Sequence, residues 1–245
     1  MTVLLLRLAA PLQSWGTSSK FVRRNTDRAP SRSGIIGLLA AAQGRRRTDR
    51  IEDLLDLRIG VRVEQPGRIE RDFHTAHTRD GAVSMPLSYR FYLADAAFLA
   101  AIEGPDAVLE GLRDALLRPA FPLYLGRRSC PPAGPFVLGL RSGDVRTVLG
   151  EEPWHASPLV QRRHPGPTAD LDTVTDSNPD DNDLAHELVR DDPISFDPRY
   201  REYGWRTVVR DKAVVPNPLY TPRGQTPSRD DHQPFDAFDI LDEVG

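Results

Sequence analysis

The chain has 245 residues, of which 39% are apolar and 27% are charged. These values exclude a fully disordered protein and suffice for one large domain or two small ones. A single cysteine, Cys130, excludes an internal disulfide and a multi-cysteine zinc site. The longest nearly apolar stretch, residues 35–42, is far shorter than the roughly 20 residues of a membrane-spanning helix, and residues 3–6 are too short for a signal peptide. We therefore expect a cytoplasmic protein with no membrane contact.

The net charge of −3 is distributed unevenly along the chain. Residues 1–130 hold 20 Lys and Arg against 14 Asp and Glu, a net charge of +6, whereas residues 131–245 hold 12 against 21, a net charge of −9. Thirty of the 32 basic residues are arginine, whose planar guanidinium suits phosphate. A basic first half favours an acidic partner such as nucleic acid, although genomic base composition also explains an excess of arginine.

The first third of the chain contains strand and helix patterns in alternation. An apolar run over residues 2–9, which ends just before a proline, predicts a buried strand. Residues 35–42 predict a buried helix with Ser31 or Ser33 as its N-cap. Residues 57–64 alternate between apolar and polar side chains, which predicts a half-buried strand.

Residues 67–86 show no periodicity and predict a long excursion from the sheet, of a length that is typical of functional or disordered segments. Further elements follow as one strand over residues 88–93 and 98–102, broken at residues 94–95, a helix at residues 106–117 and a short strand at residues 121–125. The order β-α-β-β-α-β predicts an α+β fold with a ferredoxin-like (RRM-like) domain over residues 1–150.

The remaining part, residues 151–245, predicts an irregular, strand-poor C-terminal region. It is rich in Pro, Asp and Asn up to residue 197, and residues 221–234 have the composition of a flexible tail. The few strand candidates beyond Pro135 are residues 136–140, 145–149, 205–209 and 213–215, with residues 210–212 as a hairpin turn.

Polar and basic residues follow the first predicted strand. Gln13, Ser14 and Trp15 come directly after it, and Lys20, Arg23, Arg24, Arg28 and Arg32 come next. Guanidinium and amino groups bind phosphate oxygens, and an indole can stack on a base, so these residues predict contact with RNA or DNA. A solvated basic loop explains the same pattern. Arg32 and Ser33 at a helix start favour an anion, although a simple helix cap is equally consistent.

Two further segments contain candidate site residues. Gly126, Arg127 and Arg128 follow the strand predicted at residues 121–125, where a glycine permits close approach of phosphate and the arginines supply charge. The excursion contains His74, His77 and Arg79; stacking or hydrogen bonding to RNA, a solvated loop and general acid–base catalysis all remain open for the histidines. Cys130 has no identifiable catalytic partner and is interpreted as a small buried residue. The aromatic residues Tyr89 and Phe91 are interpreted as core.

Several segments of the sequence resemble one known family. The matching residues are 6–16 (LRLAAPLQSWG), 30–39 (PSRSGIIGLL), 72–76 (DFHTA) and 121–132 (FPLYLGRRSCPP), and residues 195–199 (SFDPR) with Tyr203 and Arg206 extend the match. The chain resembles the CasD family of subunits of the type I-E CRISPR Cascade complex, within the repeat-associated RNA-binding superfamily. The acidic residues 176–183 have no counterpart in this resemblance.

The resemblance implies a ferredoxin-like RNA-binding protein with a β-hairpin thumb at residues 67–87 and a glycine-rich loop at residues 125–132. Such a subunit belongs to a ribonucleoprotein complex of antiviral defence. It caps the guide RNA (crRNA) by holding its 5′ handle, and it packs against the backbone subunits and the large subunit, so that it meets target DNA only indirectly. The resemblance implies no catalytic residue, no cofactor and no metal.

The expected RNA-binding residues combine the basic segments with this resemblance. They are Gln13, Ser14, Trp15, Lys20, Arg23, Arg24, Arg32, Ser33, His74, Arg79, Gly126, Arg127 and Arg128. The alternative function is a metal-independent endoribonuclease of the same superfamily that processes precursor guide RNA. It is disfavoured because the chain has only two lysines, Lys20 and Lys212, and neither is close in sequence to His74 or His77.

Overall fold

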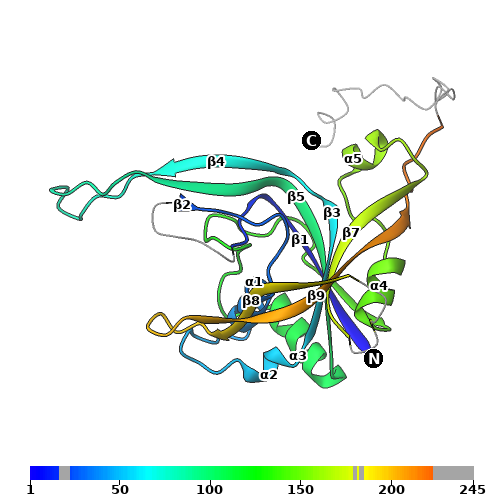
Figure 1. Ribbon diagram of the computed structural model, residues 1–245, viewed down its shortest axis with the longest axis horizontal. Coiled ribbons are helices and arrows are strands. Elements are labelled where there is room, and N and C mark those ends of the chain that lie inside the picture. Colours follow the sequence, from blue (N-terminus) through cyan, green and yellow to red (C-terminus); the bar gives the residue numbers. More distant parts are fainter. Residues whose placement is uncertain (17–22, 179–180, 182–184, 223–245) are drawn as a thin grey trace, which may run out of the picture.

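The structure is a computed structural model that describes residues 1–16, 23–178, 181 and 185–222. The described strands form one nine-stranded, mostly antiparallel sheet, with the helices interspersed between them along the chain (Figure 1). The elements are β1 (Thr2–Gln13), β2 (Arg23–Arg24), α1 (Arg32–Ala42), α2 (Glu52–Leu55), β3 (Arg58–Gln65), β4 (Arg68–His74), β5 (Ser88–Gly104), α3 (Asp106–Leu117), β6 (Val137–Ser142), α4 (Val145–Glu151), α5 (Pro158–Arg163), β7 (Thr168–Asp176), β8 (His186–Ser195) and β9 (Glu202–Pro216).

The first half of the chain forms the predicted ferredoxin-like arrangement. Its strands lie in the order β6-β1-β5-β3, all antiparallel, which is the order of a β-α-β-β-α-β unit with α1 and α3 as its helices. Strand β1 is apolar on both faces because both are covered: Leu4 and Leu6 pack into the core with α1 and α3, and Val3 and Leu5 pack against α4. Burial of both faces explains why the sequence of β1 is continuously apolar.

Helix α1 begins at the expected cap. Ser31 has extended backbone angles, and its hydroxyl accepts a hydrogen bond from the amide of Gly34. Gly34 lies against the buried indole of Trp15, and a Cβ atom at this position would come within 2.8 Å of that ring. Trp15 therefore fixes the start of the helix against the end of β1.

Three local expectations are wrong. Residues 121–125 form no strand, and the fourth strand of the unit is β6 instead. Residues 145–149 lie in helix α4, because Asp144 caps it by accepting hydrogen bonds from the amides of Arg146 and Thr147. The strand β1 does not end before Pro11 but continues to Gln13, because Pro11 is exposed and needs no partner in the ladder.

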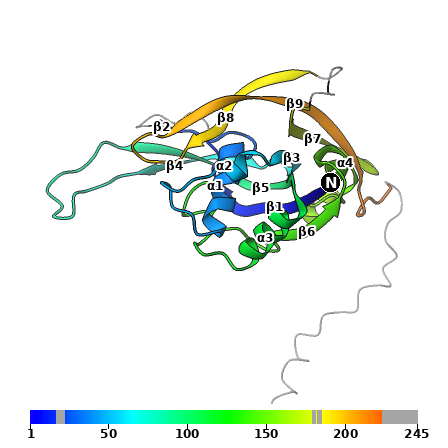
Figure 2. The same cartoon turned by 90° about the horizontal axis from the view of Figure 1, so that it is seen from below.

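The expectation of an irregular, strand-poor C-terminal region is also wrong. Strands β7, β9 and β8 extend the sheet beyond β3, and β9 is one strand of fifteen residues that runs straight through the charged residues 210–212. These polar residues lie in a ladder because their neighbours are polar too; Lys212, for example, is opposite Asp172 on β7. The extended sheet curls so that β8 packs against α1 (Figure 2).

A long β-hairpin, here called the thumb, projects from this sheet (Figure 1). It is made of β4, the outer half of β5 and the connection between them, so that it extends beyond residues 67–87, the expected thumb, into residues 88–94. Its base is a bend shared by two strands. Gly67 has a φ of 65° and lies so close to the carbonyl oxygen of Ala94 that a Cβ atom would be 2.5 Å away. Beside it, Asp95 has a φ of 55°, and its carbonyl oxygen accepts a hydrogen bond from the Gln65 amide.

The thumb buries few side chains, and this leads to a prediction about its stability. All seven residues of β4 are exposed or half-buried, whereas β1 is almost wholly buried. The β4 amides should therefore exchange with solvent hydrogen through local opening at a much lower free energy than the β1 amides. Native-state hydrogen exchange on the isolated chain measures this difference, and protection should rise when an RNA ligand is added. Equal, strong protection of β4 and β1 in the isolated chain would contradict the prediction.

Candidate nucleic-acid interface

One face of the thumb, here called the aromatic face, combines rings with guanidinium groups. Because Arg71 is opposite Phe91 and Phe73 is opposite Tyr89 in the ladder, these side chains point to the same side. The face comprises Ile69, Arg71, Phe73, Tyr89 and Phe91. Arg71 lies over the Tyr89 ring at 5.4 Å from its centroid, and Arg23 of β2 lies over the Phe91 ring at 4.9 Å. Phe73 is 66% exposed.

The opposite side, here called the ionic face, carries hydrogen-bonding and charged groups. It comprises Asp72, His74, Arg90 and Tyr92 of the thumb with Arg24 of β2 and Arg127. The Arg127 guanidinium lies 4.4 Å from the Tyr92 ring centroid and donates a hydrogen bond to the carbonyl oxygen of Arg24. His74 Nε2 is 2.8 Å from a carboxylate oxygen of Asp72.

Three nitrogen atoms on the ionic face are shielded from solvent, and two of them are guanidinium donors. Arg90 Nε, Arg127 Nη1 and His74 Nε2 have no hydrogen-bond partner among the residues that the structure describes. A shielded guanidinium N–H without an acceptor is costly, and an anionic oxygen is its strongest partner. These two donors therefore point to an anion-binding surface at the base of the thumb.

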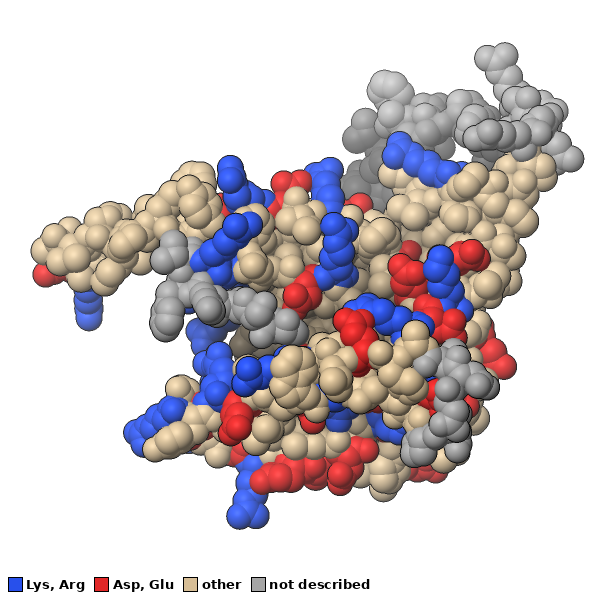
Figure 3. All heavy atoms as spheres, viewed as in Figure 1, with Lys and Arg blue, Asp and Glu red and all other residues tan. Residues whose placement is uncertain are grey.

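A cleft of about 470 Å³ opens beside the aromatic face, between the thumb, residues 26–32 and the arm formed by β8 and β9. Ile69 belongs both to the aromatic face and to the cleft lining, so the two surfaces are continuous. Arginine side chains gather around the hollow between the thumb and this arm (Figure 3). The cleft has charged walls and an apolar floor formed by Ile35, Ile59, Val61, Ile69, Val174 and Val189.

The residues predicted after the first strand are packed inside the protein. Gln13 is fully buried, where its amide donates to the carbonyl oxygens of Leu8 and Ala96 and accepts from the Trp15 indole. Ser14 is 6% exposed and Trp15 is 1% exposed. The prediction of RNA contact by these three side chains is corrected accordingly, because β1 extends further than expected and carries them into the core.

Arg32 is likewise part of a buried ion cluster. Its Nη1 is 2.5 Å from Asp176 and its Nε is 2.8 Å from Asp192, while its backbone amide donates to Asp191. Arg206 joins the cluster by binding Asp176 and Asp191 at 2.5 and 2.6 Å. Burial opposes the charged form of Arg206, but the hydrogen bond with Asp191 and the charges of both carboxylates outweigh it, so that its pKa is raised.

The ion cluster joins the start of α1 to β7, β8 and β9, and its function is structural. Arg32 is 6% exposed and also donates to the carbonyl oxygens of Leu55 and Leu57, and Ser33 is buried beside it. Neither side chain is presented to a ligand, so the prediction that they bind RNA is corrected.

In the glycine-rich loop, the glycine has a different function from the expected one. Gly126 has a φ of 86°, and a Cβ atom there would lie 1.6 Å from the carbonyl oxygen of Ser14. It is thus required for close approach to the end of β1, not to a phosphate. Cys130 closes the loop by backbone hydrogen bonds with Leu125 and Arg127, is buried as expected, and has its pKa raised by burial, which disfavours a nucleophilic thiolate.

The other predicted residues lie at the surface. Arg23 and Arg24 lie on β2 beside the outer half of β5, Arg127 lies against Arg24 and Tyr92, and His74 ends β4, whereas Arg79 is exposed beyond the end of β4 and Arg128 is exposed in the glycine-rich loop. Lys20 lies outside the described residues. Sequence reasoning missed Arg90, Tyr89, Phe91 and Tyr92 as site residues. Their alternation was visible, but only the pairing with β4 shows that Tyr89 is 39% exposed instead of core.

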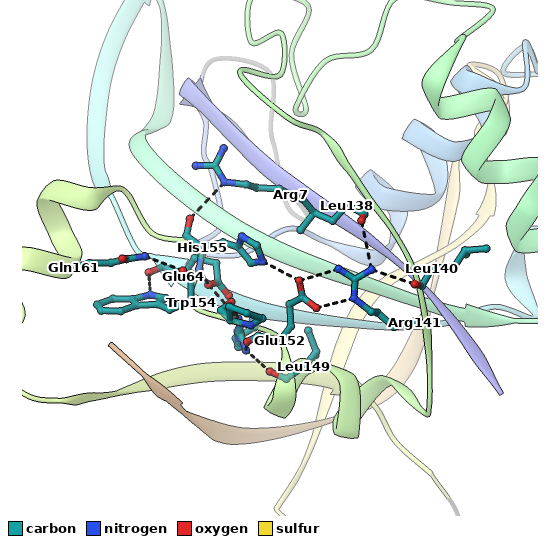
Figure 4. Close-up of polar contacts among 12 residues, drawn as sticks. Arg7, Glu64, Leu138, Leu140, Arg141, Leu149, Glu152, Trp154, His155 and Gln161 are labelled. Carbon is teal, nitrogen blue, oxygen red and sulfur yellow. Dashed lines mark hydrogen bonds and ion pairs between the residues drawn. The ribbon is translucent and has the colours of Figure 1, made fainter. Parts of the chain in front are cut away.

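A second polar network lies away from the thumb and holds the chain after α4 (Figure 4). Arg62 is fully buried and donates to Glu64 and to the carbonyl oxygens of Leu149, Glu152 and Pro153. Burial raises the pKa of Glu152, but its hydrogen bonds with Arg141 and His155 lower it more strongly, and the net shift is downward. Every charge in this network has a partner, and we assign it to structure.

The sheet and the thumb define a class of protein. A ferredoxin-like sheet from which a hairpin projects with stacked aromatic and guanidinium groups is suited to single-stranded nucleic acid. Comparison with known proteins narrows this class. Residues 3–209 match the family model described as CRISPR-associated protein (Cas_Cas5). The chain belongs to this Cas5 family of CRISPR-associated proteins.

Known relatives agree with this assignment. The chain is 36% identical over 172 residues to the CRISPR system Cascade subunit CasD of Escherichia coli (strain K12), which covers 61% of this chain and 77% of the relative. It resembles a solved chain of a CRISPR RNA-guided surveillance complex, with a TM-score of 0.73, 35% identity, and coverage of 91% of this chain and 95% of the other. A crystal structure of a Cas protein matches with a TM-score of 0.65, 35% identity, and coverage of 90% and 98%. The resemblance seen in the sequence is thereby confirmed.

No helix within the described part of the chain is long and apolar enough to span a membrane. Among the same residues, no group of three or more His, Cys, Asp and Glu side chains is placed to hold a metal ion.

Replacing a buried arginine and replacing an exposed arginine should change the free energy of unfolding by different amounts. Replacing the buried Arg32 (Arg32→Ala) leaves carboxylates uncompensated inside the protein and should lower the free energy of unfolding by about 3–5 kcal/mol. The matched control, Arg28→Ala, removes an exposed arginine of the same segment and should change it by less than about 0.5 kcal/mol. Urea denaturation measures both. A stable Arg32→Ala protein that has lost RNA binding would contradict the structural assignment.

Proposed function

We propose that this protein is a non-catalytic RNA-binding subunit of a type I-E CRISPR Cascade surveillance complex. The observation that carries the proposal is the base of the thumb, where the shielded donors of Arg90 and Arg127 adjoin aromatic rings. Membership of the Cas5 family and the similarity to CasD of E. coli support it. In this proposal the protein caps the guide RNA by holding its 5′ handle, contacts the backbone subunits and the large subunit, and acts in the cytoplasm.

The two faces of the thumb would contact different parts of the RNA. Unstacked bases would lie against Tyr89, Phe91 and the guanidinium planes of the aromatic face, which offer flat surfaces of little base preference. Phosphate oxygens would accept hydrogen bonds from Arg24, Arg90 and Arg127 on the ionic face. Binding of this kind requires no metal and no cofactor.

The proposed division of the thumb predicts different behaviour for the two faces. Arg24→Ala should weaken binding of a single-stranded repeat RNA for all sequences alike and reduce the slope of log affinity against log salt by about 0.7, the value of one phosphate contact. Tyr89→Ala should cost about 1–3 kcal/mol of binding free energy with an unchanged slope, because stacking releases no counterion.

Titrations of fluorescent RNA at several salt concentrations measure both quantities. The matched control is Arg113→Ala on α3, which removes a half-buried arginine whose ion-pair partner among the described residues is its neighbour Asp114, and which should leave the affinity unchanged. If Arg24→Ala and Arg113→Ala have the same affinity and slope as the wild type, the ionic face is not a phosphate site.

A specific observation keeps the endoribonuclease as an alternative. His74 Nε2 lies 2.8 Å from a carboxylate oxygen of Asp72 without the geometry of a hydrogen bond, and a histidine beside a carboxylate can act as a general base. Against this, Lys212 lies on β9 opposite Asp172, away from the thumb, and Cys130 is buried. Neither residue is available to assist His74.

The histidine is tested with labelled repeat RNA. The purified wild-type chain should retain the RNA intact without producing a new band, and His74→Ala should bind it more weakly. A cleavage product formed by the wild type and lost in His74→Ala with binding retained would establish the nuclease instead. If the wild type and His74→Ala bind the RNA equally and neither yields a product, the binding function stands and His74 does not contribute to it.

A further inference from the structure

The arm formed by β8 and β9 has two chemically different sides. Val189, Asp191, Arg206 and Arg210 line the cleft, so these alternate residues point toward α1, against which β8 packs. The residues between them in the sequence point away from that helix. This second side, here called the outer face, comprises Leu188, Arg190, Tyr203, Trp205 and Thr207. In Figure 2 the arm covers α1, and its outer face lies on the side away from the cleft.

The outer face exposes two large apolar side chains. Trp205 and Leu188 are each 65% exposed. Leu188 is opposite Thr207 in the ladder, and Trp205 is two residues from Thr207 on the same side, so that Leu188 and Trp205 are diagonal neighbours within reach of each other. Tryptophan, tyrosine and arginine are the residues that contribute most of the binding energy of protein interfaces. The composition of the outer face is therefore that of a protein-binding surface.

The carboxylates of the arm point to the other side of the sheet. Glu187 lines the cleft, and Asp191 and Asp192 belong to the buried ion cluster. Glu202 is separated from Arg206 by four residues of β9, so by alternation it points in the same direction as Arg206. Among the described residues of the two strands, the acidic side chains thus lie away from Trp205.

The outer face itself is cationic. Arg190 is exposed, its Nε donates a hydrogen bond to the carbonyl oxygen of Tyr203, and it forms no ion pair with another residue that the structure describes. At the border toward α4, the carboxylate of Asp181 is only 10% exposed and is paired with Arg146. An apolar and cationic surface is complementary to an apolar pocket that is bordered by carboxylates.

Other occupants of this surface are disfavoured. A strand added at the free edge of β8 would meet Pro193, which has no N–H, and two register shifts of the ladder. A second copy of the chain would bring two outer faces with the same positive charge together. Single-stranded RNA requires several cations along its backbone, whereas the outer face offers one arginine and lies on the side of the sheet away from the cleft.

We propose that the outer face docks a neighbouring protein subunit of the complex, with Trp205 and Leu188 in an apolar pocket of that subunit and Arg190 against its carboxylates. The identity of the partner as a subunit of the same complex rests on the proposed function. Because the cleft and the adjoining aromatic face lie on the other side of the arm, the chain holds RNA and this subunit at the same time.

The docking is tested on the full chain with variants of matched exposure. The backbone subunit and the large subunit, each purified singly, are titrated with the wild type and the variants. Trp205→Ser should weaken binding of one subunit about thirtyfold, the loss of a dominant interface residue, and Arg190→Glu about tenfold. The control, Val214→Ser, removes a 61% exposed apolar residue of β9 on the other side of the sheet and should change nothing. All variants should bind repeat RNA as the wild type does.

A spectroscopic measurement locates the contact. Labelling this chain alone with 5-fluorotryptophan gives one fluorine signal for each of its three tryptophans. Trp15 and Trp154 are 1% and 6% exposed, whereas Trp205 is 65% exposed. Addition of the subunit should therefore shift the Trp205 signal and leave the other two in place. The Trp205 signal is assigned by its absence from the Trp205→Phe protein.

Each result decides a separate point. A subunit that binds the wild type and Trp205→Ser equally, with an unshifted Trp205 signal, overturns the docking and leaves the proposed function intact. A shift caused by repeat RNA alone shows that the outer face binds RNA, and a shift that depends on the concentration of the chain alone shows a second copy; both overturn the protein partner. A chain that binds RNA but neither subunit also overturns the docking. If the chain binds neither RNA nor subunits, the proposed function itself fails.

Discussion

Strand β5 is the element on which the rest of the structure depends, because one chain segment forms both the centre of the core sheet and one side of the thumb. Its inner half pairs with β1 on one side and β3 on the other, and Phe98 and Ile102 are fully buried there. Its outer half pairs with β4 and β2. The pairing register of a strand determines the side to which each residue points. Burial of the inner half therefore also orients Tyr89 and Phe91 in the thumb.

The bend at the base of the thumb has an equally local cause. Asp95 adopts a left-handed conformation opposite the interruption of the ladder at Pro11, and Gly67 packs against the backbone at the same level. Both strands of the hairpin thus bend at one place, held by the hydrogen bond from Gln65 to the Asp95 carbonyl oxygen. The thumb leaves the sheet here and exposes both of its faces, which would allow bases and phosphates to contact different sides of one hairpin.

Arginines have two different functions in this protein, and the cost of removing a charge from water determines which function each one has. A guanidinium in the interior is stable only with its charge and donors satisfied, and Arg32, Arg62 and Arg206 all have carboxylate and carbonyl partners. These residues hold the extended sheet and the chain after α4 in place. Arg23, Arg24, Arg71 and Arg90 lie instead at the thumb, beside rings and solvent. The first group stabilises the scaffold, and only the second group can meet a ligand.

The sequence by itself determined the ferredoxin-like unit, the capped helix α1, the thumb as a segment and the family, because hydrophobic period, cap residues and motif strings are local properties. It did not determine that β9 is a single strand, because its polar residues 210–212 become regular only when β7 and β8 lie beside them. Nor did it separate Arg32 from Arg24, since both are arginines in one basic stretch. Only the tertiary structure brings Asp176, Asp191 and Asp192 from more than a hundred residues away to Arg32 and leaves Arg24 beside Arg90 and Arg127. Burial and long-range partners decide which charges bind the protein itself and which remain at the surface, where a ligand can reach them.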